Sequence, residues 1–240
     1  VAGTIGGTGG GGTTGGTGGT GGTGGTGGGG PRNKCLYVGA NIGGENESHD
    51  ATIIPIVKSW GYEVDRKHEA NDVNLYTAAD FEPYDFIFIS ETTRSDDIPN
   101  LRTIPLPMLD SDGFTAKEIV FGFVMGKPFA FIDPEPVIFL EGGSGHPLAA
   151  GYTPGTVIDL CTDGLIVWGQ PSISVIPIAG LQSDPTKLLI YGVEKGTTNV
   201  HGEAIQNRVS MVAVHAFGFG SLTEDAVKLY DAGKNWILEQ

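Results

Sequence analysis

The chain has 240 residues with 14 basic and 28 acidic side chains, which gives a net charge of −14 at pH 7. This acidic balance, with no cluster of Lys or Arg, argues against nucleic acid and anionic membrane surfaces as partners. No run of about 18 apolar residues occurs, so the sequence predicts no membrane-spanning helix.

Composition divides the chain at residue 30. Residues 1–30 hold 19 of the 40 glycines and eight threonines and carry no charge, whereas every charged and aromatic side chain follows Pro31. We therefore predict a Gly/Thr-rich assembly arm over residues 1–30 and one α/β domain over residues 31–240. A domain of about 210 residues buries roughly 70 % of its unfolded surface, so it needs no metal or disulfide to fold.

The threonines of the arm recur at every third position, most regularly from Thr14 to Thr26. This period matches a left-handed polyproline-II-type helix, which has about three residues per turn, and neither an α-helix nor a strand. One edge of such a helix would carry threonines and the other two only glycine, so that backbones could approach closely. Because this helix has no internal hydrogen bonds, we expect it to pack against copies of itself in a polyglycine-II-like bundle. A flexible glycine-rich linker is the alternative.

The expected packing edges and the outward-facing edge consist of different residues. The assembly glycines are Gly15, Gly16, Gly18, Gly19, Gly21, Gly22, Gly24 and Gly25. The hydroxyls that would face outward, as candidates for O-glycosylation, are those of Thr14, Thr17, Thr20, Thr23 and Thr26. Thirty residues in this conformation span roughly 90 Å, more than the roughly 43 Å diameter of the α/β domain. Head-to-tail contacts of this reach would build a filament or a surface assembly. The expected partners are copies of the same protein, which would form a homopolymer. Glycan would be a further partner if the threonines are glycosylated.

The start of the chain and its two cysteines bear on the compartment. The chain begins at Val1, and we expect that a signal segment has been removed and that the protein is secreted, extracellular or at the cell surface. Cys35 and Cys161 are far apart and form no Cys-x-x-Cys motif, so we predict neither a zinc nor a redox site. Two buried thiols are favoured over a disulfide.

The first half of the domain predicts a β-α-β unit. Residues 35–38 form a short apolar run before Gly39, and a helix with Ser48 or Asp50 as its N-cap would extend to Gly61. Apolar runs predict further strands over residues 62–64, 85–90 and 105–109, the last at a sheet margin or at a strand start because of its prolines.

The second half is rich in strands and ends in a helix. Residues 129–132 and 137–140 predict a hairpin or an insertion, and the final helix follows Thr223. The other predicted strands cover residues 157–160, 165–168, 173–176, 188–191 and 211–215. Together these elements predict a three-layer α/β sandwich with a mainly parallel sheet.

The order of these motifs resembles a known class of domain. The series comprises residues 36–39, 50–64, 85–90, 104–107, 146–151 and 232–238. It is similar to the class I glutamine amidotransferase-like, flavodoxin-like domains of secreted multidomain bacterial proteins. The resemblance covers residues 34–240 and does not extend to the Gly/Thr arm. It implies a flavodoxin-like three-layer sandwich.

The catalytic residues of that class are not recognisable in this sequence. Its enzymes use a Cys on a Gly-x-Cys-x-Gly elbow and a His-x-Glu pair, and neither Cys35 nor Cys161 has such flanks. His201 and Glu203 match His-x-Glu, but so short a match is close to chance. No Gly-x-Ser-x-Gly elbow occurs either. We therefore predict no catalytic residue, no metal and no cofactor, and a non-enzymatic extracellular structural protein.

Three other features could mark a site. The glycine-containing loop of residues 39–44 follows a strand but lacks phosphate-loop spacing, so a structural turn is favoured. Five acidic residues near strand ends could bind Ca²⁺, although solvated carboxylates are the commoner case; they are Glu91, Asp96, Asp97, Asp110 and Asp112. We expect His146 in a loop and His215 in a strand, and Asn46 begins an Asn-x-Ser glycosylation motif.

Two alternatives to a structural role stay open. One is an amidotransferase-like hydrolase preceded by a plain linker. The other is a module that binds glycan or a cell-surface partner in the cleft at the strand ends.

Overall fold

The computed structural model describes residues 32–40, 43–44, 46–68, 73–98, 101–126 and 128–239. The assembly glycines and the candidate glycosylation threonines of the arm lie outside the described residues. No helix in the described part of the chain is both long enough and apolar enough to cross a membrane.

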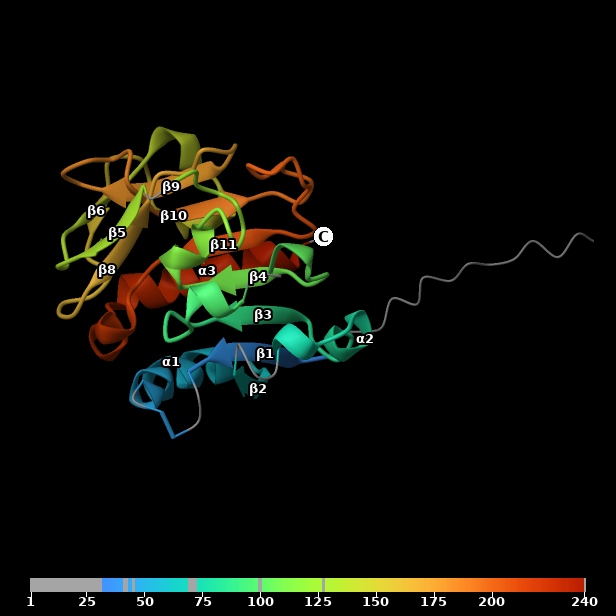
Figure 1. Cartoon of the computed structure of the whole chain (residues 1–240). Coiled ribbons are helices and arrows are strands. Elements are labelled where there is room, and N and C mark those ends of the chain that lie inside the picture. The colour runs from blue at the N-terminus through green and yellow to red at the C-terminus, as the bar shows by residue number, and fades with distance from the viewer. Residues whose placement is uncertain are drawn as a thin grey trace, which may run out of the picture. The chain divides into compact units, whose positions relative to one another are not determined.

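Five parallel strands form one half of the sheet, in the order β2-β1-β3-β4-β11 (Figure 1). Their bounds are Lys34–Gly39 for β1, Glu63–His68 for β2, Phe86–Ile89 for β3, Met108–Asp110 for β4 and Val209–Val212 for β11. The four residues of β3 are all buried, as expected for a parallel strand covered on both faces. The fold is thus mixed α/β with a mostly parallel central sheet, as the sequence predicts at this level.

Antiparallel strands extend the sheet beyond β11 in the order β10-β9-β6-β7, while β8 pairs with β10 and β5. Their bounds are Phe129–Ile132 for β5, Val137–Phe139 for β6, Val157–Ile158 for β7, Ile166–Gly169 for β8, Ile176–Leu181 for β9 and Leu188–Val193 for β10. The predicted hairpin of β5 with β6 is wrong, because β5 pairs with β8 and β6 pairs with β7 and β9.

Two hydrophobic clusters cover the two faces of the sheet. On one face, α1 (Glu47–Ser59) and α3 (Glu224–Leu238) pack with alternate strand residues such as Tyr37 and Phe88. The other face, with Leu36 and Ile87, is covered by α2 (Ala78–Phe81) and short 3-10 turns. The turns on this second face include η1 (Val73–Leu75), η3 (Leu101–Thr103) and η4 (Gly113–Ala116). The turns η6 (Pro147–Ala149) and η7 (Ala216–Ser221) instead lie with α3 and α1 on the first face. The other described 3-10 turns are η2 (Ser95–Asp97) and η5 (Glu141–Gly143).

Helix α1 begins earlier than the sequence predicts. Asn46 occupies its N-cap, so Ser48 and Asp50 lie in the first turn rather than at the cap. Asp50 is fully buried, because its carboxylate turns inward to polar partners instead of capping the helix. The prediction for α3 is confirmed: Thr223 is its N-cap, and its side chain accepts a hydrogen bond from the Ala226 N–H.

Two predicted strands need correction. Strand β4 (Met108–Asp110) is internal to the sheet, so the margin alternative is wrong. The strand-start alternative fits better, because Pro105 and Pro107 lie just before the strand and need no ladder hydrogen bond within it. Of residues 173–176 only Ile176 belongs to a strand, and β9 continues to Leu181. Pro177 and Gly180 conceal that strand in the sequence.

Candidate functional site

The carboxyl ends of β1, β3 and β4 lie at one edge of the sheet, because these strands are parallel neighbours. Ligands of open α/β sheets usually bind at this edge. The segments that follow the three strands carry three groups of polar residues, centred on Asp50, on Asp112 and on Glu91.

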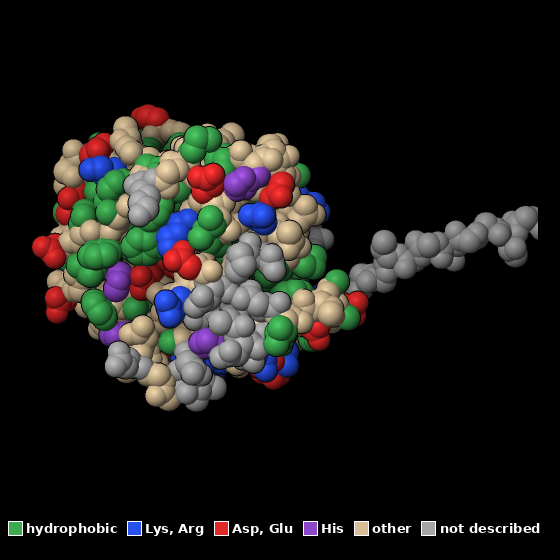
Figure 2. Space-filling view, in the orientation of Figure 1, with side chains coloured by type: hydrophobic (Ala, Val, Ile, Leu, Met, Phe, Trp, Pro, Cys, Tyr) green, Lys and Arg blue, Asp and Glu red, His purple; other side chains and the backbone are tan. Residues whose placement is uncertain are grey.

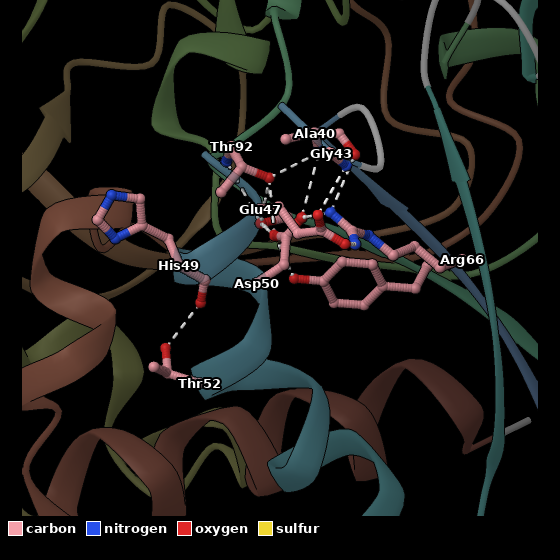
Figure 3. Close-up of polar contacts among 10 residues, drawn as sticks. Ala40, Gly43, Glu47, His49, Asp50, Thr52, Arg66 and Thr92 are labelled. Atoms are coloured by element: carbon pink, nitrogen blue, oxygen red, sulfur yellow. Dashed lines mark hydrogen bonds and ion pairs between the residues drawn. The ribbon is translucent and has the colours of Figure 1, made fainter. Parts of the chain in front are cut away.

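Asp50 is the centre of a buried hydrogen-bond network (Figure 3). Its Oδ1 accepts hydrogen bonds of 2.7 Å from each of the hydroxyls of Tyr37, Ser90 and Thr92. Its Oδ2 accepts from Arg66 at 2.7 Å and from the Ala40 N–H at 3.2 Å. The carboxylate is therefore fully partnered and fixes the segments that follow β1 and β3.

This network supports the prediction of a structural turn after β1 rather than a phosphate loop. The N–H of Gly43 donates to Glu47 at 2.6 Å, and Arg66 also donates to Glu47 and to the carbonyl of Ala40. The backbone N–H groups of Ala40 and Gly43 thus both donate to carboxylates of the protein itself. Asn41 and Ile42 lie outside the described part of the chain.

Asp110 and Asp112 form the second group and are buried rather than solvated. The Asp112 N–H donates to Asp110 Oδ1 at 2.8 Å, and the Thr115 hydroxyl donates to Asp110 Oδ2. Asp112 caps η4 by accepting from the Phe114 N–H at 2.8 Å, and it accepts from Thr93 at 3.2 Å. Burial raises the pKa of Asp110 well above its ordinary range and that of Asp112 to about 7.

Glu91 and His215 form the third group. Glu91 Oε2 accepts from the Ala216 N–H at 2.7 Å, and Oε1 lies 3.3 Å from His215 Nε2. The Phe217 N–H donates to His215 Nδ1 at 3.2 Å, so the neutral ring carries its proton on Nε2, facing Glu91. The prediction of a strand position for His215 is wrong, because the residue follows β11 and caps η7.

Distance alone would make this contact an ion pair, but burial disfavours charge on both partners. It raises the pKa of Glu91 to about 9, with the neighbouring charge of Asp112 adding to the effect, and it lowers the pKa of His215. At neutral pH we therefore treat the contact as one between uncharged groups. The low exposure of both side chains, 6 % for Glu91 and 16 % for His215, favours their uncharged forms.

The five predicted acidic residues thus fall into different environments. Glu91, Asp110 and Asp112 are buried, so solvation is the wrong interpretation for them. Asp96 is exposed and pairs with Lys117 at 2.8 Å, while Asp97 belongs to η2 and its side chain is outside the described part. Among the described residues no three His, Cys, Asp or Glu side chains are arranged to hold a metal ion.

The two cysteines are buried free thiols, as predicted. Burial raises the pKa of Cys35 far above its ordinary value and that of Cys161 to about 11. Among the described residues neither thiol hydrogen-bonds to a histidine, and the Cys161 thiol faces the carbonyl of Leu165. Burial and a raised pKa disfavour the thiolate, which is the form that acts as a nucleophile.

His201 and Glu203 do not form a catalytic pair. The backbone N–H groups of both donate to the side-chain oxygen of Asn199. The ring of His201 contacts the carbonyl of Glu118 at 2.7 Å, and Glu203 pairs with Arg102 at 2.8 Å. The motif therefore forms part of a hydrogen-bonded loop.

His146 lies in a loop, as the sequence predicts. His146 precedes η6 in a loop, where its Nδ1 accepts from the Leu148 N–H. Burial lowers the pKa of His146. Asn46 is exposed at the start of α1.

The comparisons with known proteins identify a fold and no family. No protein-family profile matches the chain, and no curated protein matches it in sequence. One similar structure is a ThuA-like protein of Bacteroides uniformis, with a TM-score of 0.53 and 14 % identity, covering 86 % of this chain and 91 % of that one. Another is a ThuA-like protein of Parabacteroides merdae, with a TM-score of 0.53 and 11 % identity, covering 85 % and 89 %.

ThuA-like proteins have the class I glutamine amidotransferase-like, flavodoxin-like fold. The fold-level part of the resemblance seen in the sequence is therefore confirmed. At identities this low the likeness concerns the fold alone, and function has to be argued from the site.

Proposed function

We propose that this protein is a non-enzymatic extracellular structural protein that assembles through residues 1–30 into a filament or a surface assembly. The observation that carries this proposal is the period-three placement of threonine in an uncharged, otherwise glycine-rich segment. Such a segment has two side-chain-free edges when wound as a polyproline-II-type helix, and its backbone groups need external partners. Copies of the same segment meet both requirements.

The chemistry of the α/β domain supports a non-enzymatic role over an amidotransferase-like hydrolase. Both thiols are buried and protonated. Ser111, which follows β4, is also buried; its hydroxyl donates to the Ile89 carbonyl at 3.1 Å and accepts from the Glu91 N–H at 3.2 Å. Neither of these two contacts joins the Ser111 hydroxyl to a histidine or carboxylate side chain that could activate it.

The same proposal includes a three-layer flavodoxin-like fold for the domain and secretion of the protein. The two layers that cover the sheet fit a three-layer flavodoxin-like sandwich. Its resemblance to domains of secreted bacterial proteins, together with the Gly/Thr arm, supports secretion. Within such an assembly the domain would decorate or join the subunits.

A second role for the domain is ligand binding at the carboxyl edge of the sheet. The specific observation is that aromatic side chains adjoin the Glu91–His215 contact, and two of them, Phe131 and Phe217, are exposed. Binding sites combine such apolar surface with a few polar groups. This role is compatible with assembly through the arm.

Deletion of residues 1–30 tests the assembly proposal. Electron micrographs and sedimentation should show assemblies for the full chain and dispersed, folded monomers for residues 31–240. Circular dichroism checks that the shortened chain keeps its secondary structure. Equal assembly of both chains would refute a role for the arm.

A further inference from the structure

A groove follows α3 on the first face of the sheet, away from the polar groups of the carboxyl edge. Its volume is about 580 Å³. The apolar part of its lining consists of half-buried side chains, among them Trp60 after α1, Ala150 after η6, and Val227 and Ala232 on α3. We call this feature the α3 groove.

Polar side chains of α3 line the same groove. Lys228 supplies a hydrogen-bond donor, Asp231 an acceptor and Asn235 both, and all three reach solvent. Asp231 accepts from Asn235 at 3.2 Å and pairs with Lys234 at 3.0 Å, and the Lys234 ammonium lies 5.4 Å from the centroid of the Trp60 ring. These contacts position the lining and leave further donors and acceptors of Lys228 and Asn235 for a partner.

This combination suits an extended backbone. Aromatic-lined grooves with hydrogen-bonding side chains are a recurrent way of binding polyproline-II-type segments, whose own N–H and C=O groups are unpaired. The lining residues of α3 run from Val227 to Glu239 and span about 18 Å along the helix axis. That length matches about six residues of a polyproline-II-type helix, or about two Gly-Gly-Thr repeats.

Charge favours a neutral occupant. Lys228 lines the groove together with Asp231 and Glu239, so both signs are present. On the face of the domain seen in Figure 2, the basic side chains drawn in colour likewise lie among acidic ones. A neutral segment meets such a lining without bringing in a charge that needs a partner. Residues 1–30 are the uncharged segment that this protein itself supplies.

We propose that the α3 groove binds the Gly/Thr arm of a second copy of the protein. The side-chain-free edges of the arm let its backbone approach Trp60 and Ala232 closely. The unpaired backbone groups of the arm exchange hydrogen bonds with Lys228, Asp231 and Asn235. The inference rests on the proposed assembly through residues 1–30 and names the surface that receives the arm.

The position of the groove favours a second copy over the same chain. The Asn33 carbonyl, at the base of the arm, accepts from the Glu63 N–H at 2.8 Å, and Trp60 comes only three residues before Glu63. A polyproline-II-type segment extends by about 3.1 Å per residue and does not turn back on a site beside its own base. An arm in the groove of another copy is a heterologous contact, and repetition of such contacts builds a filament.

A variant that fills the groove tests the inference on the full chain. Ala232→Phe places a bulky ring in the groove, and sedimentation should show the assembled fraction reduced at least tenfold. Ala51→Phe, at an exposed helical alanine of α1 outside the groove, should assemble like the parent. Lys228→Ala with Asn235→Ala removes polar groups without filling space and should also reduce assembly. Circular dichroism checks that each variant is folded, and the double variant carries the test if Ala232→Phe is not.

Mixing two full-length variants distinguishes an arm in a groove from arms that bind only one another. Ala232→Phe keeps its arm, and Gly18→Val with Gly19→Val keeps its groove. Neither should assemble alone, whereas an equimolar mixture should form heterodimers, because one arm and one groove are intact in each pair. The heterodimers should not grow into filaments.

Three results would overturn the inference. Equal assembly of Ala232→Phe and the parent would show that arms bind one another and would leave the proposed role of residues 1–30 intact. A mixture without heterodimers would exclude the groove as the receiving surface. A parent chain that does not assemble would overturn both this inference and the proposed function.

Discussion

The carboxyl of Glu91 and the ring of His215 meet at 3.3 Å although the two residues are far apart in the sequence. Each also accepts a backbone N–H at the start of η7, Glu91 from Ala216 and His215 from Phe217. Two titratable groups therefore hold the turn that presents Phe217. The structure of this edge should depend on their protonation.

The first prediction concerns the pH dependence of stability. Folding raises the pKa of Glu91 from 4.5 to about 9, so the folded chain keeps a proton that the unfolded chain releases. The stability that this proton brings is complete below about pH 4.5 and is lost as the pH rises through about 9. Asp112, with a pKa of about 7, acts in the same direction. Urea unfolding should show a lower free energy of unfolding at pH 9 than at pH 5.

Glu91→Gln, a neutral mimic of the protonated acid, should remove much of this dependence. The variant should unfold like the parent at pH 5 and be more stable by about 1–3 kcal/mol at pH 9. Glu82→Gln, at an exposed position, is the matched control. Parallel pH profiles for the parent and Glu91→Gln would show that Glu91 is ionised in the folded chain.

The second prediction concerns Asp50. Asp50→Ala would leave the Tyr37, Ser90 and Thr92 hydroxyls and the Arg66 guanidinium without their shared acceptor. The free energy of unfolding should fall by about 3–5 kcal/mol, because three buried hydroxyls lose their acceptor and the largely buried Arg66 keeps only Glu47 as a carboxylate partner. Asp231→Ala, which removes a half-exposed carboxylate that pairs with Lys234 and accepts from Asn235, should cost about 1 kcal/mol or less. Similar losses in both variants would contradict the central role of Asp50.

The third prediction concerns the close approach of α3 to the sheet. A Cβ on Gly233 would lie 2.7 Å from Ser210 Oγ and 2.8 Å from Leu109 Cδ1. Gly233→Ala should therefore destabilise the domain by about 1–3 kcal/mol, even though alanine favours a helix. Gly220→Ala, where the added Cβ has nothing within 4 Å, is the control. A rise in the thermal midpoint for Gly233→Ala would mean that the sheet yields easily there.

The fourth prediction concerns the thiols. Since burial raises the pKa of both Cys35 and Cys161, neither should react with Ellman's reagent in the native protein, and both should react in urea. Ser59→Cys, at an exposed position, supplies a reactive thiol as a positive control. Rapid native labelling of Cys161 would reopen the case for a thiol enzyme.

The fifth prediction concerns the arm. Gly18→Val with Gly19→Val should impair sedimentation of the assembly more than Thr20→Ser does. A Cβ on a packed glycine edge forces neighbouring backbones apart, whereas the threonine edge has room. If the valine variant assembles like the parent, the arm is a tether.

Local pattern in the sequence was sufficient for the elements of the parallel half. The apolar runs of β1 and β3 and the amphipathic turn spacing of α3 are short-range signals of burial, and the structure confirms them. The partners of β5 and the extent of β9 escaped prediction, because strand pairing depends on residues far away and Pro177 masks the strand pattern.

Some features of the candidate site could likewise be predicted from the sequence, and others could not. The sequence by itself determined that acidic residues follow β3 and β4 and that no cysteine has a nucleophile elbow. Only the tertiary structure decided that Glu91 meets His215, that Asp50 turns inward, and that rings from η4 and β5, and from η7 and α1, come into contact. The physical reason is that burial and side-chain contact depend on which distant segments pack together, and this packing also shifts the pKa values of the carboxyls.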